Sequence, residues 1–170
     1  SDADSDADSD ADSDADSDAD ADSDVDTDQE CTPPTEGTSG KNPLFTQFYT
    51  ADPAPMVYNC TFYIICGHDE GRSGFTLHNW YILSSTDMVN WSENGGPVMG
   101  WINFSWAGGN AWASQMIERN GKFFWYVPIA ERVGPMAIGV AISDTPTGPF
   151  TDPISKPLID DRLEMANWNY

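Results

Sequence analysis

Two stretches of residues 41–170 repeat the same order of strand-like runs and turns, and this repeat limits the possible folds more than any other feature. A pair of runs at Pro55–Tyr58 and Phe62–Cys66 corresponds to a pair at Ala113–Arg119 and Phe123–Val127. The offsets between matching positions are 58–61 residues. The runs are rich in β-branched and aromatic residues, and no stretch has helical periodicity, so the sequence predicts an all-β chain.

Each repeat continues beyond its hairpin in the same way. The run Trp80–Ser85 corresponds to Ile138–Ser143, and each is followed by a turn and an aromatic residue, Trp91 or Phe150. The dipeptide Asn120-Gly121 is a strong hairpin signal, because both central residues of a tight primed turn need positive φ. Each unit of about sixty residues is therefore predicted to hold a hairpin, a further strand and a closing aromatic residue.

Such a unit is typical of one four-stranded blade of a β-propeller. Two blades cannot close a ring, because propellers typically have four to eight. We therefore expect the domain to continue beyond residue 170. A β-sandwich is the alternative, but its strands recur every 8–12 residues without a long repeat.

Charge is distributed unevenly and excludes one class of function. Residues 1–40 hold 16 of the 28 acids and no Lys or Arg, which leaves 12 acids and 7 bases in residues 41–170. This balance offers no basic surface for phosphates, so nucleic-acid binding is not expected. No apolar run approaches the roughly 18 residues of a membrane span. The first residues also lack the features of a secretory signal peptide, so either the protein stays inside the cell or Ser1 is not its true start.

Residues 1–40 are predicted to be a disordered linker, with the domain boundary near Lys41. Ser-Asp and Ala-Asp repeat almost without interruption, and no large apolar residue occurs before Val25. Such a segment cannot bury enough surface to offset the entropy lost on ordering, and its charges favour an extended spacer. Weak calcium or partner binding is the alternative, although the repeat lacks the Gly and Glu of a calcium loop.

The three cysteines do not form a fully paired set. Cys31 lies in the linker. If the run Phe62–Cys66 is extended, Cys60 and Cys66 are about 20 Å apart, too far for a disulfide. We therefore expect no bridge between these two, with Cys60 in a turn and Cys66 as a small buried hydrophobic residue.

Asp52 is the first candidate site residue. Pro53 and Pro55 follow it and remove donors from the strand, which predicts an edge strand. Pro53 also favours an extended conformation at Asp52. The innermost strand of a propeller blade is an edge that faces the central axis, so Asp52 is predicted to point toward the channel mouth. A simple turn residue is the alternative.

Aromatic residues provide the next candidates. Trp101, Trp106 and Trp112 lie in or beside a loop rich in Gly and Asn that ends near Asn110. Aromatic faces stack on the apolar faces of sugar rings, so these residues are candidates for sugar binding. Trp80, Trp91 and Trp125 lie in strand-like runs and are predicted to be core residues.

Segment 67–70 is the remaining candidate, because it places His68 beside two acids. This is a weak metal signal without a second ligand cluster, and strand-end hydrogen bonding is the favoured interpretation. Phosphate-loop, dinucleotide, zinc and nucleophile-elbow motifs are absent, so no cofactor or metal ion is predicted.

These segments together resemble the N-terminal part of glycoside hydrolase family 43, and within it the members that act on arabinoxylan as arabinofuranosidases or β-xylosidases. The resemblance covers essentially all of residues 42–170. It depends on six segments in order: Tyr49–Tyr58, Gly67–Glu70, Ser84–Trp91, Ala111–Ala113, Glu118–Val127 and Ser143–Phe150.

The resemblance implies a five-bladed β-propeller, of which this chain would hold about the first two blades, and an inverting glycosidase. Asp52 matches the family's general base, while Trp112, Trp106 and Asn110 lie where the family forms part of its active-site wall. The general acid and the Asp that tunes it would lie beyond Tyr170, so these 170 residues alone are predicted to be inactive and poorly folded.

A polymeric substrate such as arabinoxylan implies a secreted enzyme with other modules in the same chain. The resemblance leaves arabinofuranoside and xyloside specificity open. A propeller that binds glycans through its Trp-rich loop without hydrolysis is the alternative function.

Overall fold

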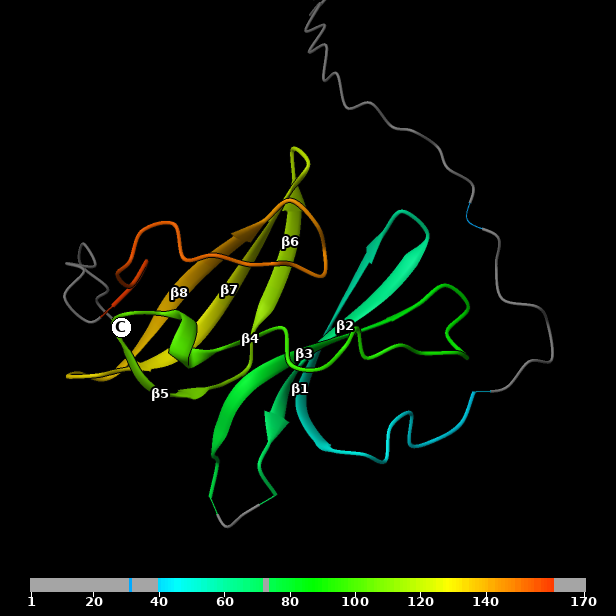
Figure 1. Ribbon diagram of the computed structural model, residues 1–170, viewed down its shortest axis with the longest axis horizontal. Helices are drawn as coiled ribbons and strands as arrows, with labels where there is room; N and C mark the ends of the chain where they lie inside the picture. The colour runs from blue at the N-terminus through cyan, green and yellow to red at the C-terminus, as the bar shows by residue number, and fades with distance from the viewer. Residues whose placement is uncertain (1–30, 32–39, 72–73, 161–170) are drawn as a thin grey trace, which may run out of the picture.

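The computed structural model describes residues 31, 40–71 and 74–160, and these residues form the all-β chain that the sequence predicts (Figure 1). The predicted disordered linker, apart from residues 31 and 40, lies outside the described residues, as do residues 161–170. The one described helix is the single 3-10 turn η1 (Trp101–Asn103). The strands are β1 (Tyr49–Tyr58), β2 (Thr61–Asp69), β3 (Leu77–Ser85), β4 (Met99–Gly100), β5 (Ala107–Ala111), β6 (Gln115–Arg119), β7 (Lys122–Glu131) and β8 (Met136–Ser143).

The strands form two successive antiparallel sheets that repeat one plan. The first sheet has the order β1-β2-β3-β4. In the second, β7 pairs with β8 on one side and with both β5 and β6 on the other, so β5 and β6 act as one interrupted edge strand. In each sheet the last long strand also forms an isolated bridge with the segment that follows it. Ser84 of β3 pairs with Ser92, and Ile142 of β8 pairs with Thr151. The structure thus confirms the internal repeat.

Both predicted hairpins are present, and both turns have positive φ at their two central residues. Asn120 and Gly121 have φ values of 56° and 72°, as expected for a tight primed turn. In the first sheet Asn59 and Cys60 have φ values of 45° and 56°. Cys60 therefore occupies a left-handed position that Gly fills in the second repeat, which explains why the first turn has the weaker sequence signal.

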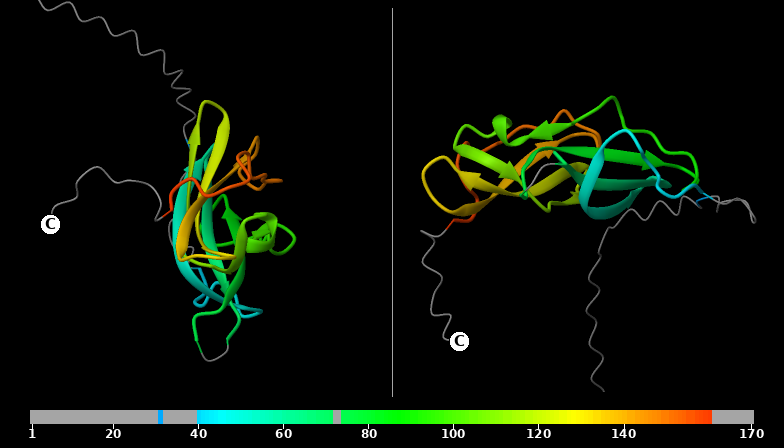
Figure 2. Two further views of the ribbon diagram at one scale, coloured as in Figure 1. Left: turned by 90° about the vertical axis from the view of Figure 1, so that its left-hand side faces the viewer. Right: turned by 90° about the horizontal axis from the view of Figure 1, so that it is seen from below.

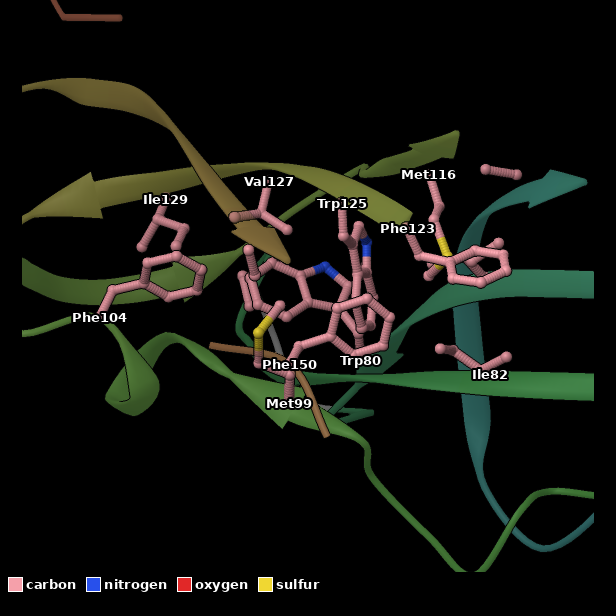
Figure 3. Close-up of a cluster of buried hydrophobic side chains, with 14 of the residues drawn as sticks. Trp80, Ile82, Met99, Phe104, Met116, Phe123, Trp125, Val127, Ile129 and Phe150 are labelled. Atoms are coloured by element: carbon pink, nitrogen blue, oxygen red, sulfur yellow. The ribbon is translucent and has the colours of Figure 1, made fainter. Parts of the chain in front are cut away.

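The hydrophobic core lies between the two sheets, which stand side by side in Figures 1 and 2. Trp80 of β3 and Trp125 of β7 are fully buried, and their ring centroids are 5.8 Å apart (Figure 3). Each contributes apolar area from one sheet to the same cluster, so the core joins the two repeats. Other members drawn from both repeats are Ile65, Ile82, Met99, Phe104, Met116, Phe123, Val127, Ile129 and Phe150.

The predicted core tryptophans and closing aromatic residues differ in their burial. Trp80 and Trp125 are core residues as predicted, and Phe150 packs edge-on against Trp125 at 4.9 Å. The prediction for Trp91 was wrong, because its ring is only half-buried outside the strands and its indole N–H donates to the backbone carbonyl of Met88. At this position a hydrogen bond within the turn takes the place of packing of the indole ring in the core.

The turn after β3 is organised by the carboxylate of Asp87. This carboxylate accepts hydrogen bonds from the backbone N–H groups of Asn90 (2.7 Å) and Val89 (2.9 Å), from the Asn90 amide (2.7 Å) and from the Ser85 hydroxyl (3.0 Å). The bonds from Asn90, followed by those from Val89 and Ser85, hold the pKa of Asp87 well below its usual range. The ionised carboxylate therefore stabilises this turn.

Asp87→Asn should lower the thermal unfolding midpoint at pH 7. The difference in midpoint between this variant and the protein without the substitution should shrink under acid conditions. A depressed folded-state pKa contributes stability that is complete above the unfolded value of about 3.9 and is lost as the pH falls toward the folded value. Unfolding midpoints measured from pH 7 to pH 2 check this. Asp144→Asn, which removes a charge from the exposed pair with Lys122, is the control. A difference that stays constant with pH would contradict the role of Asp87.

The cysteines differ in part from the prediction. Cys31 and Cys60 form a disulfide, with Cα atoms 5.0 Å apart. This pairing was not predicted, whereas the position of Cys60 in a turn and the absence of a bridge between Cys60 and Cys66 are as expected. Cys66 is a buried free thiol, as predicted, and burial raises its pKa to about 11. It is therefore inert at neutral pH.

Candidate active site

Asp52 lies on β1, which is the edge of the first sheet as the two prolines predict. Ala51 pairs with Gly67 and Ala54 with Ile65, so the β1 segment between these pairs holds one residue more than its partner. Asp52 therefore lies in a β-bulge. Bulges are common beside active sites because they redirect a side chain.

The prediction that Asp52 is extended was wrong. Its φ is 53°, in the left-handed region. Asp tolerates this conformation better than most residues, and the bulge rather than the following proline determines it. A non-glycine residue held in a sparsely populated conformation indicates a position where the surrounding structure fixes the side chain direction.

Asp52 and Trp112 line the same pocket, which has a volume of about 430 Å³. The pocket collects residues from both sheets and from the β2–β3 loop, and it contains two carboxylates. Its volume lies in the range of small-molecule sites. Its lining residues are Ala51, Asp52, Asp69, Phe75, Leu77, Trp112 and Ala113.

Trp112 lies in the interruption between β5 and β6 and is held by three hydrogen bonds. Its backbone N–H donates to the carbonyl of Pro128 at 3.1 Å, and its carbonyl accepts from the indole of the buried Trp80 at 2.7 Å. Its own indole N–H donates to the carbonyl of Phe75 at 3.3 Å. The half-buried Trp112 ring is thus connected both to the core and to the β2–β3 loop.

The structure does not bring the other two predicted substrate-binding residues to this pocket. Trp106 lines a separate hollow of about 670 Å³, and its indole N–H donates to Asp152 at 3.2 Å. Asn110 is a half-buried residue of β5 with φ of 56°. The five residues between Trp106 and Trp112 are the whole of β5, which separates the two side chains along the chain.

The strand-end segment that includes His68 makes the hydrogen bonds that the favoured interpretation predicts. His68 Nδ1 lies 3.2 Å from Asn79 Oδ1, and the Glu70 carboxylate lies 3.3 Å from His78 and 3.8 Å from His68. In the part of the chain that the structure describes, no three His, Cys, Asp or Glu side chains are grouped to hold a metal ion. No described helix is long and apolar enough to cross a membrane.

Asp69, Leu77 and Phe75 also line the pocket and were not among the predicted site residues. Asp69 was considered for a metal site or for strand-end hydrogen bonding, and it both lines the pocket and accepts the Gly71 N–H at 3.0 Å. Leu77 is a buried residue at the start of β3. Phe75 carried a usable signal, because a large aromatic residue next to Gly74, in a loop between strands, has no evident core role.

A comparison with protein families matches this architecture to one family. The model described as "Glycosyl hydrolases family 43" matches residues 40–165. The chain belongs to glycosyl hydrolase family 43. Asp52, Trp112 and the remaining pocket residues all lie within the matched region.

Two curated relatives in this family carry related names. The arabinoxylan arabinofuranohydrolase of Bacillus subtilis (strain 168) is 36% identical over 141 residues, which cover 69% of this chain and 26% of the relative. The xylosidase/arabinosidase 43A of Humicola insolens is 33% identical over 119 residues, covering 64% of this chain and 36% of the relative. The chain therefore spans only about a quarter to a third of the length of these two relatives.

Solved family 43 structures share this backbone arrangement. An enzyme from Xanthomonas citri in complex with xylotriose has a TM-score of 0.63 and 33% identity, covering 68% of this chain and 34% of its own. A β-xylosidase/α-arabinofuranosidase from a compost microbial metagenome, also with xylotriose, has a TM-score of 0.64 and 32% identity, covering 70% and 38%. The two sheets thus correspond to about a third of a family 43 structure.

Proposed function

We propose that the intact protein is a glycosidase that hydrolyses arabinofuranosyl or xylosyl linkages of arabinoxylan-type glycans by an inverting mechanism. The observation that carries this proposal is the position of Asp52, which lies on a β-bulge of an edge strand and lines a pocket with Trp112. Family 43 membership and relatives named for arabinoxylan and xylose support the substrate class.

In this mechanism Asp52 is the general base. It accepts a proton from a water molecule, and the water oxygen attacks the anomeric carbon on the face opposite the leaving group. A carboxylic acid about 6.5–9.5 Å away donates its proton to the leaving oxygen as the glycosidic bond breaks. The family resemblance assigns that acid to a residue after Tyr170, so we infer that these 170 residues alone are inactive.

Trp112 is the proposed wall of the sugar site. Its ring is fixed by hydrogen bonds of its backbone and its indole, which leaves its faces for contact with a pentose ring. Trp106 and Asn110 remain predicted substrate contacts. Because Trp106 lines a different hollow, its contact would be with a more distant part of a long glycan.

The two sheets are proposed to be the first two blades of a five-bladed β-propeller. Each sheet has an edge strand that carries a pocket residue at an irregularity: Asp52 at the bulge of β1, and Trp112 between β5 and β6. Edge strands that face a common axis would place these residues at one channel mouth. The shared strand plan of the two sheets supports this arrangement.

We also propose that the protein is secreted and that the acidic segment connects this domain to other modules. The Cys31–Cys60 disulfide supports a compartment outside the reducing cytosol, because such bonds persist in oxidising environments. A polymeric substrate is consistent with the same location.

The experiment that tests the function follows the anomeric proton signals of the released pentose by NMR. The intact protein acting on arabinoxylan oligosaccharides should first release the anomer opposite to that of the cleaved linkage, which then mutarotates. A sample of the 170-residue chain, assayed beside it, should release no pentose. Initial release of the retained anomer would reject inversion, and no hydrolysis by the intact protein would reject the enzyme assignment.

A further inference from the structure

Phe75 is the most exposed of the large hydrophobic residues that line the Asp52 pocket. Its exposed fraction is 87%, whereas Leu77, two residues later on the same segment, is 4% exposed. The pocket therefore runs from an apolar floor at Leu77 to an aromatic ring at its mouth. A Phe ring that is largely exposed adds little to folding, because most of its apolar surface stays in water.

The backbone at Phe75 is nevertheless held in place. Its carbonyl accepts the Trp112 indole N–H at 3.3 Å, which ties the β2–β3 loop to the second sheet. One residue further, the carbonyl of Thr76 accepts the Glu70 N–H at 3.3 Å and closes the loop. Leu77 then packs so closely on Gly67 that a Cβ there would lie 2.3 Å from Leu77 Cδ2. The ring is thus presented to solvent from a fixed base.

Gly74 adds a local reason for this presentation. Its φ is 103°, a conformation that residues with a Cβ rarely adopt. The chain turns at this glycine immediately before Phe75, and no atom lies within 4 Å of the position a Cβ would take. The turn therefore depends on backbone freedom rather than on close packing.

We propose that Phe75 is a specificity-determining residue that binds the glycan unit on the leaving-group side of the bond cleaved next to Asp52. This inference rests on the proposed function. The cleaved pentose must lie beside Asp52 and Trp112, so the ring at the mouth contacts the part of the substrate that extends outward. Phe75 would favour oligosaccharides over substrates with a small leaving group, since an aromatic face stacks on the apolar face of a sugar ring.

The test compares two substrates that release the same pentose from the intact protein. One is an arabinoxylan oligosaccharide, and the other is the methyl glycoside, whose leaving group is too small to reach the ring. Phe75→Ala should lower kcat/KM about tenfold on the oligosaccharide, as expected when roughly 1.4 kcal/mol of contact is lost. On the methyl glycoside the change should stay within about twofold, because the interactions at Asp52 are retained.

Two further variants separate substrate binding from structure. Phe75→Tyr keeps an aromatic face and should restore kcat/KM on the oligosaccharide. Val133→Ala shortens a hydrophobic residue of 88% exposure outside the pocket and should affect neither substrate. The unfolding midpoint of Phe75→Ala should be unchanged. Equal losses on both substrates, or no loss on the oligosaccharide, would overturn the proposal.

A separate measurement distinguishes failure of this inference from failure of the proposed function. If the intact protein hydrolyses neither substrate, the proposed function is wrong, and binding of xylotriose is then measured by calorimetric titration. A loss of xylotriose affinity of about tenfold in Phe75→Ala would still support the glycan contact. Unchanged affinity would contradict it.

Discussion

Asp52→Asn should reduce the turnover of arabinoxylan oligosaccharides by the intact protein by about 10²–10⁴-fold, the usual contribution of a general base. The amide keeps the size and most of the polarity of the carboxylate but does not accept the proton of the attacking water. Substrate affinity should change little, because the Trp112 wall and the Phe75 ring are unaltered. Single-turnover assays for kcat and titration with xylotriose for affinity check the two expectations separately.

Two control variants test whether the loss of turnover in Asp52→Asn is specific to this carboxylate. Asp69→Asn removes the other carboxylate of the same pocket. A much smaller loss of turnover in that variant would show that the loss in Asp52→Asn is not a general effect of removing negative charge from the pocket. Asp144→Asn removes a distant exposed carboxylate and should leave turnover unchanged. Unaltered turnover in Asp52→Asn would remove Asp52 from the mechanism. Binding without hydrolysis in the unchanged protein would favour the glycan-binding alternative.

Trp80→Ala should produce the largest loss of stability, about 3–5 kcal/mol, because it removes a fully buried indole from the core between the sheets. It also deprives the Trp112 carbonyl of its 2.7 Å hydrogen bond. The unfolding midpoint should fall by roughly 10 °C or more for a domain of this size. Thermal unfolding followed by circular dichroism measures the shift.

Trp80→Phe and Trp91→Ala separate the two effects at Trp80. The Phe variant keeps most of the buried apolar area but cannot donate to Trp112, so we expect a smaller stability loss of about 1–3 kcal/mol together with weaker xylotriose binding. Trp91→Ala removes an indole that is half-buried outside the strands and should cost much less than Trp80→Ala. Equal losses at Trp80 and Trp91 would show that the core between the sheets is not the main source of stability.

The sequence predicted those parts of the fold that depend on local signals. The turn at Asn120-Gly121 and the edge position of β1 follow from positive-φ preference and from missing donors, and both are present. The Cys31–Cys60 disulfide was not predicted, because 29 residues separate the partners and a linker sequence carries no spatial information. Spatial proximity across such a distance is a property of the folded chain.

The candidate site was predictable only in part for a similar reason. Asp52 and Trp112 come from different repeats, and the family resemblance was the feature that linked them. The same resemblance grouped Trp106 with them, whereas the structure places it in another hollow. The left-handed conformation of Asp52 depends on the register between β1 and β2, which alternation of residues does not reveal.

The disulfide also determines how mechanical force enters this domain. Cys60 lies at the β1–β2 turn, and Asp52 lies eight residues earlier on β1, roughly 25 Å away for an extended strand. Tension applied at Cys31 would pass through the disulfide into that turn and would bypass the chain between the two cysteines, which includes Asp52 on β1. This tension would therefore enter the domain at the end of the hairpin remote from Asp52.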